Sequence, residues 1–345
     1  MPSSTTENFT DPDEFHVAIR GAEIQLLNVE PADFRASLTI LDLGGTTMQS
    51  AGTNLRRTFR IAQAWDYISV LFRTKAGPPL IWDGAQIGEG TIVIRGPGAE
   101  CYVRTNGPTH WAAVSIAQKD LPGLSSRFFA SITPAPYSCR ILQPSEGTLN
   151  QLKILNDRAN RMAAQSPDLF AQPQMARALG RSLAEAITAC LLSSTRLENA
   201  FRRFSHKVIM DRFTHFFEDN PDMALNMQEL CHTIGVPQRT LQLCCQEFLG
   251  MSPGRYLRLR RFHLARQALC SSNPADTSVT DIATHYGFWE FGRFAAQYRS
   301  LFGELPSATL KRAPTPSSQP DACAFWLNRP ANRCVDSATL LAESA

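Results

Sequence analysis

The chain has 345 residues, of which 43% are hydrophobic and 19% charged, and its formal net charge is +3. This length suits two domains of ordinary size, and the composition is that of a globular protein. No apolar run approaches the roughly 20 residues that a membrane span requires, and the polar N-terminus lacks the apolar segment of a secretory signal. We therefore expect a cytoplasmic protein whose residues 1–14 are disordered.

The nine cysteines are scattered, odd in number and free of any C-x-x-C pair. This pattern argues against a disulfide framework and against a structural zinc site. Cys231, Cys245 and Cys270 fall on apolar positions of predicted helices. Such positions favour buried structural thiols over redox sensing.

Residues 15–145 have the pattern of a β-rich domain. Runs of apolar and β-branched residues at 36–41, 67–72 and 91–95 are separated by Gly and Pro clusters. Asn106 and Gly107 stand between two further runs, and this pair supplies the positive φ that a tight hairpin needs. The sequence therefore predicts a sandwich or barrel with a hairpin at this pair.

Residues 146–200 change from a period of two to a period between three and four. Apolar residues recur at this spacing over 149–162 and again over 176–187, and Pro167 and Pro173 lie between the two stretches. The pattern predicts two helices joined by a short loop. Their apolar faces fit a dimerisation seam and packing on their own domain equally well.

Residues 201–312 are predicted to be helical throughout. The stretch 201–313 holds 14 Lys and Arg against 10 Asp and Glu, a mild basic excess that is a weak sign of phosphate binding. Residues 313–345 open with Pro and Ser residues and are predicted to be a disordered tail.

One helix-turn-helix pattern occurs twice in this helical region. In each copy a small residue, Cys231 or Ala283, stands four positions before a glycine, Gly235 or Gly287, and a second amphipathic helix follows. The two glycines are 52 residues apart. A repeat in this register predicts two recognition helices in one chain.

A helix that starts with Ser252 as N-cap and Pro253 in its first position connects the two copies. Its roughly 17 residues span about 25 Å, which lets one monomer reach two successive major grooves. Phosphate contact and solvated surface charge are equally consistent with the five arginines on this helix, which are Arg255, Arg258, Arg260, Arg261 and Arg266.

The region resembles the AraC/XylS transcription regulators. The resemblance is carried by residues 235–242 (GVPQRTLQ), 248–257 (FLGMSPGRYL), 265–269 (ARQAL) and 286–306, about a third of the chain. Residues 239–242, 247–253 and 287–289 are similar to the ethanolamine-operon regulator branch. The resemblance implies an α+β multidomain protein with an N-terminal cupin-like sensing domain, a helical linker pair and a C-terminal double helix-turn-helix domain. It also implies a homodimer that acts with RNA polymerase.

The family's base-reading positions fall on Arg239, Gln242 and Leu243 in the first recognition helix. Arg suits guanine, Gln suits adenine, and Leu can touch a thymine methyl. In the second helix the corresponding residues cannot donate a side-chain hydrogen bond to a base, so we expect phosphate contacts there and specificity mainly from the first helix. The full set predicted to contact DNA is Gln238, Arg239, Gln242, Leu243, Gln246, Glu290, Phe291, Gly292, Arg293, Ala296 and Arg299.

The N-terminal domain offers aromatic residues that would wall an apolar pocket and arginines that would present a charge to it. The alternative is a purely structural role, in which these residues belong to the core and rim of a β domain. The predicted effector-binding residues are Arg57, Trp65, Trp82, Arg95 and Trp111. Further candidates for the walls and the charge are Phe59, Phe72, Tyr102, Arg56 and Arg104.

Signatures of catalysis are missing from the sequence. His16 and His110 are the only histidines before residue 200, and neither a metal-binding cupin motif nor a phosphate-binding loop occurs. We expect no metal, no cofactor and no enzyme activity. The prediction is a sequence-specific DNA-binding activator controlled by a small molecule at its N-terminal domain.

Two other classes of protein stay open at this point. An enzyme or methyl-acceptor domain fused to a DNA-binding module would need a reactive Cys beside His and Glu, and Cys101 and Cys139 have no such neighbours in sequence. The second class is an architectural DNA binder without an effector. The large N-terminal domain argues against this class, because DNA binding alone does not require it.

Overall fold

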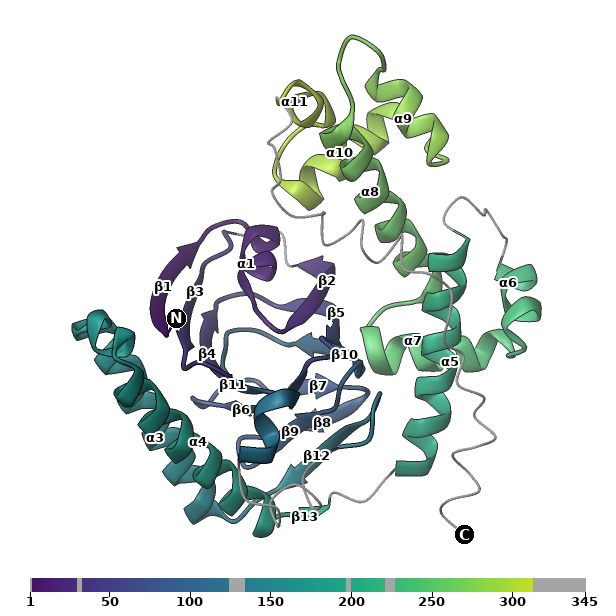
Figure 1. Ribbon diagram of the computed structural model, residues 1–345. Coiled ribbons are helices and arrows are strands. Elements are labelled where there is room, and N and C mark those ends of the chain that lie inside the picture. Colours follow the sequence, from purple (N-terminus) through teal and green to yellow (C-terminus); the bar gives the residue numbers. More distant parts are fainter. Residues whose placement is uncertain (1, 30–32, 124–133, 197–199, 221–226, 313–345) are drawn as a thin grey trace.

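The computed structural model describes residues 2–29, 33–123, 134–196, 200–220 and 227–312. Figure 1 shows a β domain of two sheets with a pair of long helices on one side and the C-terminal helices on the other. The predicted order of a β-rich N-terminal domain, a helix pair and an all-α C-terminal domain is confirmed. Within the described ranges, every helix is too short or too polar to span a membrane.

The larger sheet is antiparallel and has eight strands in the order β1-β3-β4-β11-β6-β9-β12-β13. The strands are β1 (Ser3–Phe9), β3 (Ala36–Asp42), β4 (Thr46–Thr53), β6 (Tyr67–Arg73), β9 (Ile92–Arg95), β11 (Thr109–Ala117), β12 (Cys139–Gln143) and β13 (Thr195–Arg196). The predicted apolar runs correspond to β3, β6 and β9.

The smaller sheet has five strands in the order β2-β5-β10-β7-β8. These are β2 (Ala22–Val29), β5 (Arg57–Gln63), β7 (Leu80–Trp82), β8 (Ala85–Ile87) and β10 (Glu100–Thr105). Two short helices, α1 (Pro12–Ala18) and the 3₁₀ helix η1 (Gln118–Gly123), complete the domain.

Alternation along the strands divides the side chains between the layers. On β9, Ile92 and Ile94 face the long helices, whereas Val93 joins the core between the sheets. On β10, Cys101 and Val103 belong to the same inner core. Because successive side chains of a strand point to opposite faces, each sheet serves two layers.

The helix pair packs on the outer face of the larger sheet. It consists of α3 (Glu146–Gln165), the 3₁₀ helix η2 (Pro167–Ala171) and α4 (Pro173–Leu192), as the two prolines predict. Leu152 and Leu183 are fully buried and share one hydrophobic cluster with Val70 and Val114 of the sheet. The apolar faces are therefore used inside the chain, which favours packing over a dimerisation seam.

The C-terminal domain begins with α5 (Ala200–Asp219). The first helix-turn-helix is α6 (Met227–Ile234) and α7 (Gln238–Leu249), and α8 (Pro253–Ser271) leads to the second, α9 (Val279–His285) and α10 (Phe291–Phe302), which α11 (Pro306–Lys311) follows. Each copy has its own hydrophobic cluster, centred on Leu241 and Phe248 in the first and on Phe294 and Tyr298 in the second. Ser252 caps α8 as predicted, accepting from the Arg255 amide at 3.3 Å.

Three predictions need correction. Residues 3–9 form β1, whose seven residues pair with β3, so residues 1–14 are not wholly disordered. The turn at Asn106 and Gly107 is not a hairpin, because β10 lies in the smaller sheet and β11 in the larger one, so the turn carries the chain from one sheet to the other. Cys270 is exposed near the end of α8. The predicted disordered tail, residues 313–345, lies outside the described residues.

Candidate DNA interface and effector cavity

The turns of the two helix-turn-helix copies have the same backbone geometry. Gly235 has a φ of +68° and Gly287 a φ of +75°. After each glycine an amide returns to the small residue of the first helix, from Val236 to the Cys231 carbonyl at 3.0 Å and from Phe288 to the Ala283 carbonyl at 2.9 Å. Because only glycine adopts this φ without strain, the pair of glycines is a structural requirement of the repeated turn.

The first recognition helix, α7, presents its predicted contact residues to solvent. Its buried face, formed by Leu241, Cys245 and Phe248, packs in the cluster of the first copy. Leu243 is 51% exposed, although burial of an aliphatic side chain lowers the free energy of the folded protein. An exposed leucine at this position is therefore consistent with a contact surface. The residues exposed on the opposite face are Gln238, Arg239, Gln242, Leu243 and Gln246.

The second recognition helix, α10, is exposed over a more apolar face. It begins at Phe291, later than the predicted start at Trp289, and Glu290 is its N-cap. Trp289 is 74% exposed and Phe291 42%. Glu290 and Arg293 form an exposed ion pair at 3.2 Å. All six residues predicted for this helix are exposed, namely Glu290, Phe291, Gly292, Arg293, Ala296 and Arg299.

Partners within the chain occupy three of the five arginines on α8. Arg266 contacts Asp13 of α1 at 2.6 Å, Arg260 donates to the Phe217 carbonyl, and Arg258 donates to the Gln297 side chain. Arg255 and Arg261 are the exposed members of the set. Both are placed for phosphate contact, and of the two Arg261 also lies over the Phe288 ring, with its Cζ 5.6 Å from the ring centroid.

A cavity lies between the two sheets of the β domain. It is partly open to solvent, and its lining is mainly apolar with a few polar groups, as is typical of small-molecule sites. Four of the five predicted effector residues line it, namely Arg57, Trp82, Arg95 and Trp111. The remaining lining residues are Phe15, His16, Ile19, Arg20, Ile24, Gln49, Phe59, Ile61, Leu71, Leu80, Val103, Thr105, Thr109 and Ala113.

Two buried arginines give the cavity its charge. Arg57 is 2% exposed, and its guanidinium contacts His16 Nε2 at 3.1 Å and donates to Thr53 Oγ1 at 3.0 Å. Arg95 is 3% exposed and lies over the Trp82 ring. Nε of Arg57 and both Nε and Nη1 of Arg95 find no hydrogen-bond partner among the described residues. Burial lowers the pKa of Arg57 to about 9 and also lowers the pKa of Arg95.

The lining offers these cations no carboxylate, because none of the described residues around the cavity is Asp or Glu. Burial, followed by the charge of Arg57, lowers the pKa of His16, so this ring adds no positive charge near neutral pH. A buried cation without a counterion is costly, and an anionic ligand would relieve that cost at both arginines.

Several predicted pocket residues lie elsewhere. Trp65 is 38% exposed and packs edge-on against Tyr137, outside the cavity. Phe72 points into the cluster with the long helices, and Tyr102 into the cluster with the first helix-turn-helix. Strand alternation explains both positions, because Phe72 and Tyr102 are each next in sequence to a residue whose side chain points between the two sheets. Of the other candidates, Phe59 lines the cavity, whereas Arg56 and Arg104 do not.

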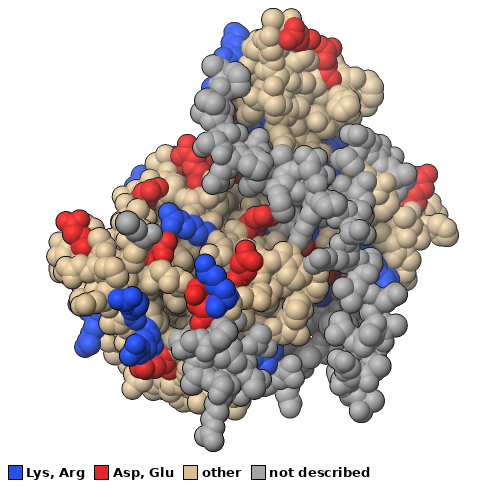
Figure 2. Space-filling model, in the orientation of Figure 1, with Lys and Arg blue, Asp and Glu red and all other residues tan. Residues whose placement is uncertain are grey.

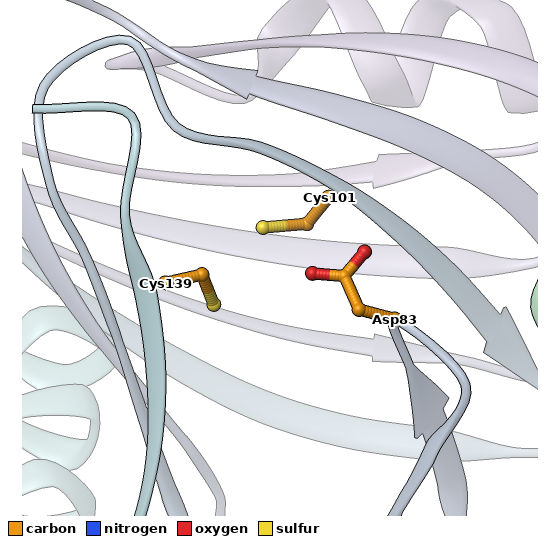
Figure 3. A group of neighbouring side chains, drawn as sticks. All are labelled: Asp83, Cys101 and Cys139. Atoms are coloured by element: carbon orange, nitrogen blue, oxygen red, sulfur yellow. The ribbon is translucent and has the colours of Figure 1, made fainter. Parts of the chain in front are cut away.

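Sequence reasoning missed a second polar group at the edge of the inner core. Figure 3 shows the side chains of Asp83, Cys101 and Cys139 converging, and their oxygen and sulfur atoms all lie within 4.8 Å of one another. The three residues come from the β7–β8 turn, β10 and β12. No local spacing signals this group, because the fold brings together three separate segments.

Surface charge contributes little on the face drawn in Figure 2, where Lys and Arg are interspersed with Asp and Glu over the β domain. This mixture agrees with a net charge of only +3. The contact residues on α7 and α10 therefore define the candidate DNA interface better than charge does.

Comparison with known proteins concerns mainly the C-terminal domain. Residues 230–312 match the family model described as a helix-turn-helix domain. Over 102 residues, 30% of this chain, the protein is 38% identical to the XylDLEGF operon transcriptional activator 3 of Pseudomonas putida, and over 99 residues, 29% of this chain, it is 36% identical to the probable thc operon regulatory protein of Rhodococcus erythropolis. The match spans about a third of each relative, 31% and 30%.

Among solved structures, the AraC-like transcriptional activator CuxR aligns with 77% of this chain and 96% of its own, at 16% identity and a TM-score of 0.38. The two curated relatives are named as an operon activator and an operon regulator. Residues 230–312 therefore match a helix-turn-helix domain, and about 100 residues of the chain are similar in sequence to an operon activator, as the AraC/XylS resemblance implies.

Proposed function

We propose that the protein is a sequence-specific DNA-binding transcription activator, controlled by an anionic small molecule in the cavity of its β domain. The observation that carries DNA binding is the repeated helix-turn-helix, in which both recognition helices expose the predicted contact residues. RNA polymerase as a partner and a homodimeric state follow from the AraC/XylS resemblance. The resemblance to the ethanolamine-operon regulator branch stays a prediction.

The effector class follows from the cavity lining. Arg57 and Arg95 supply charge from opposite sheets, and the aromatic rings of Phe59, Trp82 and Trp111 supply an apolar surface. A carboxylate with a compact apolar or aromatic body matches both features, because guanidinium groups bind carboxylates through paired hydrogen bonds.

Coupling between the cavity and DNA is supported by the position of the smaller sheet. The inner face of β10 lines the cavity with Val103, and its outer face carries Tyr102 into the cluster of the first helix-turn-helix. The Tyr102 hydroxyl lies 2.7 Å from Thr214 Oγ1, and the Thr58 hydroxyl of β5 donates to the Leu249 carbonyl at the end of α7 at 3.4 Å. One sheet thus separates ligand from recognition helix, so a shift of β5 or β10 moves α7.

Genome-wide footprinting of the full-length protein tests the DNA-binding part. A regulator is expected to occupy a few discrete promoter sites. Diffuse coverage of the genome would favour the architectural alternative and contradict the proposal.

Thermal unfolding with matched ligands tests the effector part. A carboxylate such as phenylacetate is expected to raise the melting temperature increasingly as its concentration rises above Kd, whereas the neutral amide phenylacetamide is not. Arg95→Met is expected to abolish the shift and to leave the ligand-free protein at least as stable, because it removes an unpaired buried charge. A library of small anions, each paired with its amide, extends the test; equal responses to both members of every pair would refute the anionic class.

The enzyme and methyl-acceptor alternative gains no support from the geometry. A methyl acceptor needs a thiol beside His and Glu, and the group around Cys101 in the described chain consists of Asp83 and Cys139. Two curated relatives of this chain are named as an operon activator and an operon regulator.

A further inference from the structure

The group of Asp83, Cys101 and Cys139 joins the two sheets of the β domain (Figure 3). Cys101 on β10 belongs to the smaller sheet and is fully buried, whereas Cys139 on β12 belongs to the larger sheet and is half-buried. The Trp82 indole, which lines the cavity, donates to Cys139 Sγ at 3.2 Å. The two thiols therefore lie beside the proposed effector cavity.

Three convergent ligand atoms are consistent with either a metal site or a dithiol pair, and the neighbouring charges distinguish the two. Arg95 is the cross-strand partner of Cys139, and two of its nitrogens lack a partner among the described residues. Lys207 of α5 forms an ion pair with Asp211 at 2.9 Å, and the charges of Asp211 and then Asp83 raise the pKa of this lysine. Two cations beside three donors oppose a divalent ion, and this favours the dithiol pair.

The environments of the two thiols differ. The Cys101 sulfur lies within 4.8 Å of an Asp83 carboxylate oxygen, and burial raises the pKa of this thiol well above its usual range. Cys139 is the more accessible sulfur and faces the guanidinium of Arg95 across the strand pair. An attacking role therefore suits Cys139, and a resolving role suits Cys101.

We propose that Cys101 and Cys139 are a reversible redox pair, which a peroxide oxidises to an intrachain disulfide. The Cys139 thiolate attacks one peroxide oxygen, the O–O bond breaks, and the departing hydroxide takes the proton released by the Cys139 thiol, leaving water and a sulfenic acid. Cys101 sulfur then attacks Cys139 sulfur while Asp83 accepts the Cys101 proton. The sulfenic hydroxide leaves and takes up that proton as a second water.

The overall reaction moves two electrons from the two thiols to the peroxide, which becomes two molecules of water. A thiol reductant reverses it by disulfide exchange. The new bond would tie β10 to β12 across the two sheets, one residue from Tyr102, which contacts α5. Oxidation would thus act on the wall that the cavity shares with the DNA-binding domain.

Peptide mass mapping of the full-length protein after stoichiometric hydrogen peroxide tests the proposal. The background carries Cys270→Ser, Cys323→Ser and Cys334→Ser, because Cys270 is exposed and the other two lie outside the described residues. We expect a Cys101–Cys139 linked peptide, lighter than the reduced pair by two hydrogen atoms, that disappears on treatment with dithiothreitol. Cys139→Ser should abolish it, and Cys101→Ala should leave a sulfenic acid on Cys139 that dimedone traps.

Two outcomes would overturn the proposal. In the first, the pair stays reduced in the background protein while Cys270 of the unmodified chain is oxidised. In the second, the reduced protein binds one equivalent of Zn²⁺ that Cys139→Ser loses, which would make the group a metal site. The linked-peptide measurement needs no substitution inside the group, so it stays informative where Cys101→Ala fails to fold. It also has no DNA or effector readout, so its failure is separate from failure of the proposed function.

Discussion

At the scale of single residues, the two recognition helices differ in what they offer to DNA. Arg239 and Gln242 are exposed on α7 and carry the hydrogen-bonding groups that read guanine and adenine. The exposed face of α10 carries Phe291, Gly292 and Ala296, which have no such groups. The expected division is base reading by α7 and backbone or apolar contact by α10.

Arg239→Ala tests this division. Loss of a bidentate contact is expected to weaken binding to the cognate site by about 1 to 3 kcal/mol and to leave binding to random DNA little changed. Arg299→Ala, on the exposed face of α10, is the matched control and should weaken both to a similar degree. Fluorescence anisotropy with both DNAs at one fixed salt concentration measures the difference. Equal losses of affinity for the cognate and the random DNA in Arg239→Ala would contradict the assignment of base reading to Arg239.

Asp83 gives a prediction on pH. Burial raises its pKa to about 6, while in the unfolded chain the group titrates near its ordinary value of about 4. Between these values the folded protein binds more protons than the unfolded chain, so stability falls as the pH rises from about 4 to about 6 and the penalty is complete above that. Over this pH range the free energy of unfolding of the wild type should fall by roughly 1 to 3 kcal/mol relative to that of Asp83→Asn. Urea unfolding at a series of pH values measures it; a constant difference between the two proteins would contradict it.

At the scale of elements, β10 and α5 meet through a buried hydrogen-bond network. The Tyr102 hydroxyl donates to the Met210 carbonyl at 3.2 Å and pairs with Thr214 Oγ1 at 2.7 Å. Tyr102→Phe should lower the free energy of unfolding by about 1 kcal/mol, because it removes the buried hydrogen bonds that this hydroxyl makes to α5. Thr214→Val should lower the free energy of unfolding by a similar amount. The double variant should lower it by less than the sum of the two single effects. Denaturant unfolding of the four proteins gives the coupling energy; additive losses would mean that the two hydroxyls act independently.

The same elements show where sequence reasoning succeeded and where it failed. The helices of the repeat were predictable because caps and glycines are local signals, as at Ser252 and Gly235. The cavity was predictable in part, because alternation alone cannot tell which of two buried faces holds a ligand. Trp65 was misplaced for lack of any local signal that it lies in a loop, and the pairing of β10 depends on distant strands. The meeting of Asp83 with two cysteines likewise depends on the closed arrangement of both sheets.

At the scale of the whole molecule, α8 sets the distance between the two recognition helices. It has 19 residues, which correspond to about 28 Å of helix. Its N-terminal part packs in the first cluster through Tyr256 and its C-terminal part in the second through Phe262 and Leu269. The two copies are thus connected by one rigid element rather than by a loose linker.

A rigid connection fixes the spacing of the DNA site. Insertion of about five base pairs between the two contacted segments turns one of them to the opposite face of the duplex, so affinity should fall towards that for random DNA. An insertion of about ten base pairs restores the face but not the distance and should not rescue binding. Gel-shift titration with the original operator and the two operators that carry insertions measures the affinities. Unchanged affinity after either insertion would show that α7 alone accounts for binding.

The layered arrangement also limits how the protein can change in length. Successive residues of β10 face different layers, with Cys101 and Val103 towards the inner core and Tyr102 towards the first helix-turn-helix. A one-residue insertion or deletion within this strand would exchange the two sets, placing the tyrosine in the ligand space and a thiol against α5. Ligand response and packing of the β domain on the first helix-turn-helix would then fail together, so this short strand cannot accept a one-residue change in length.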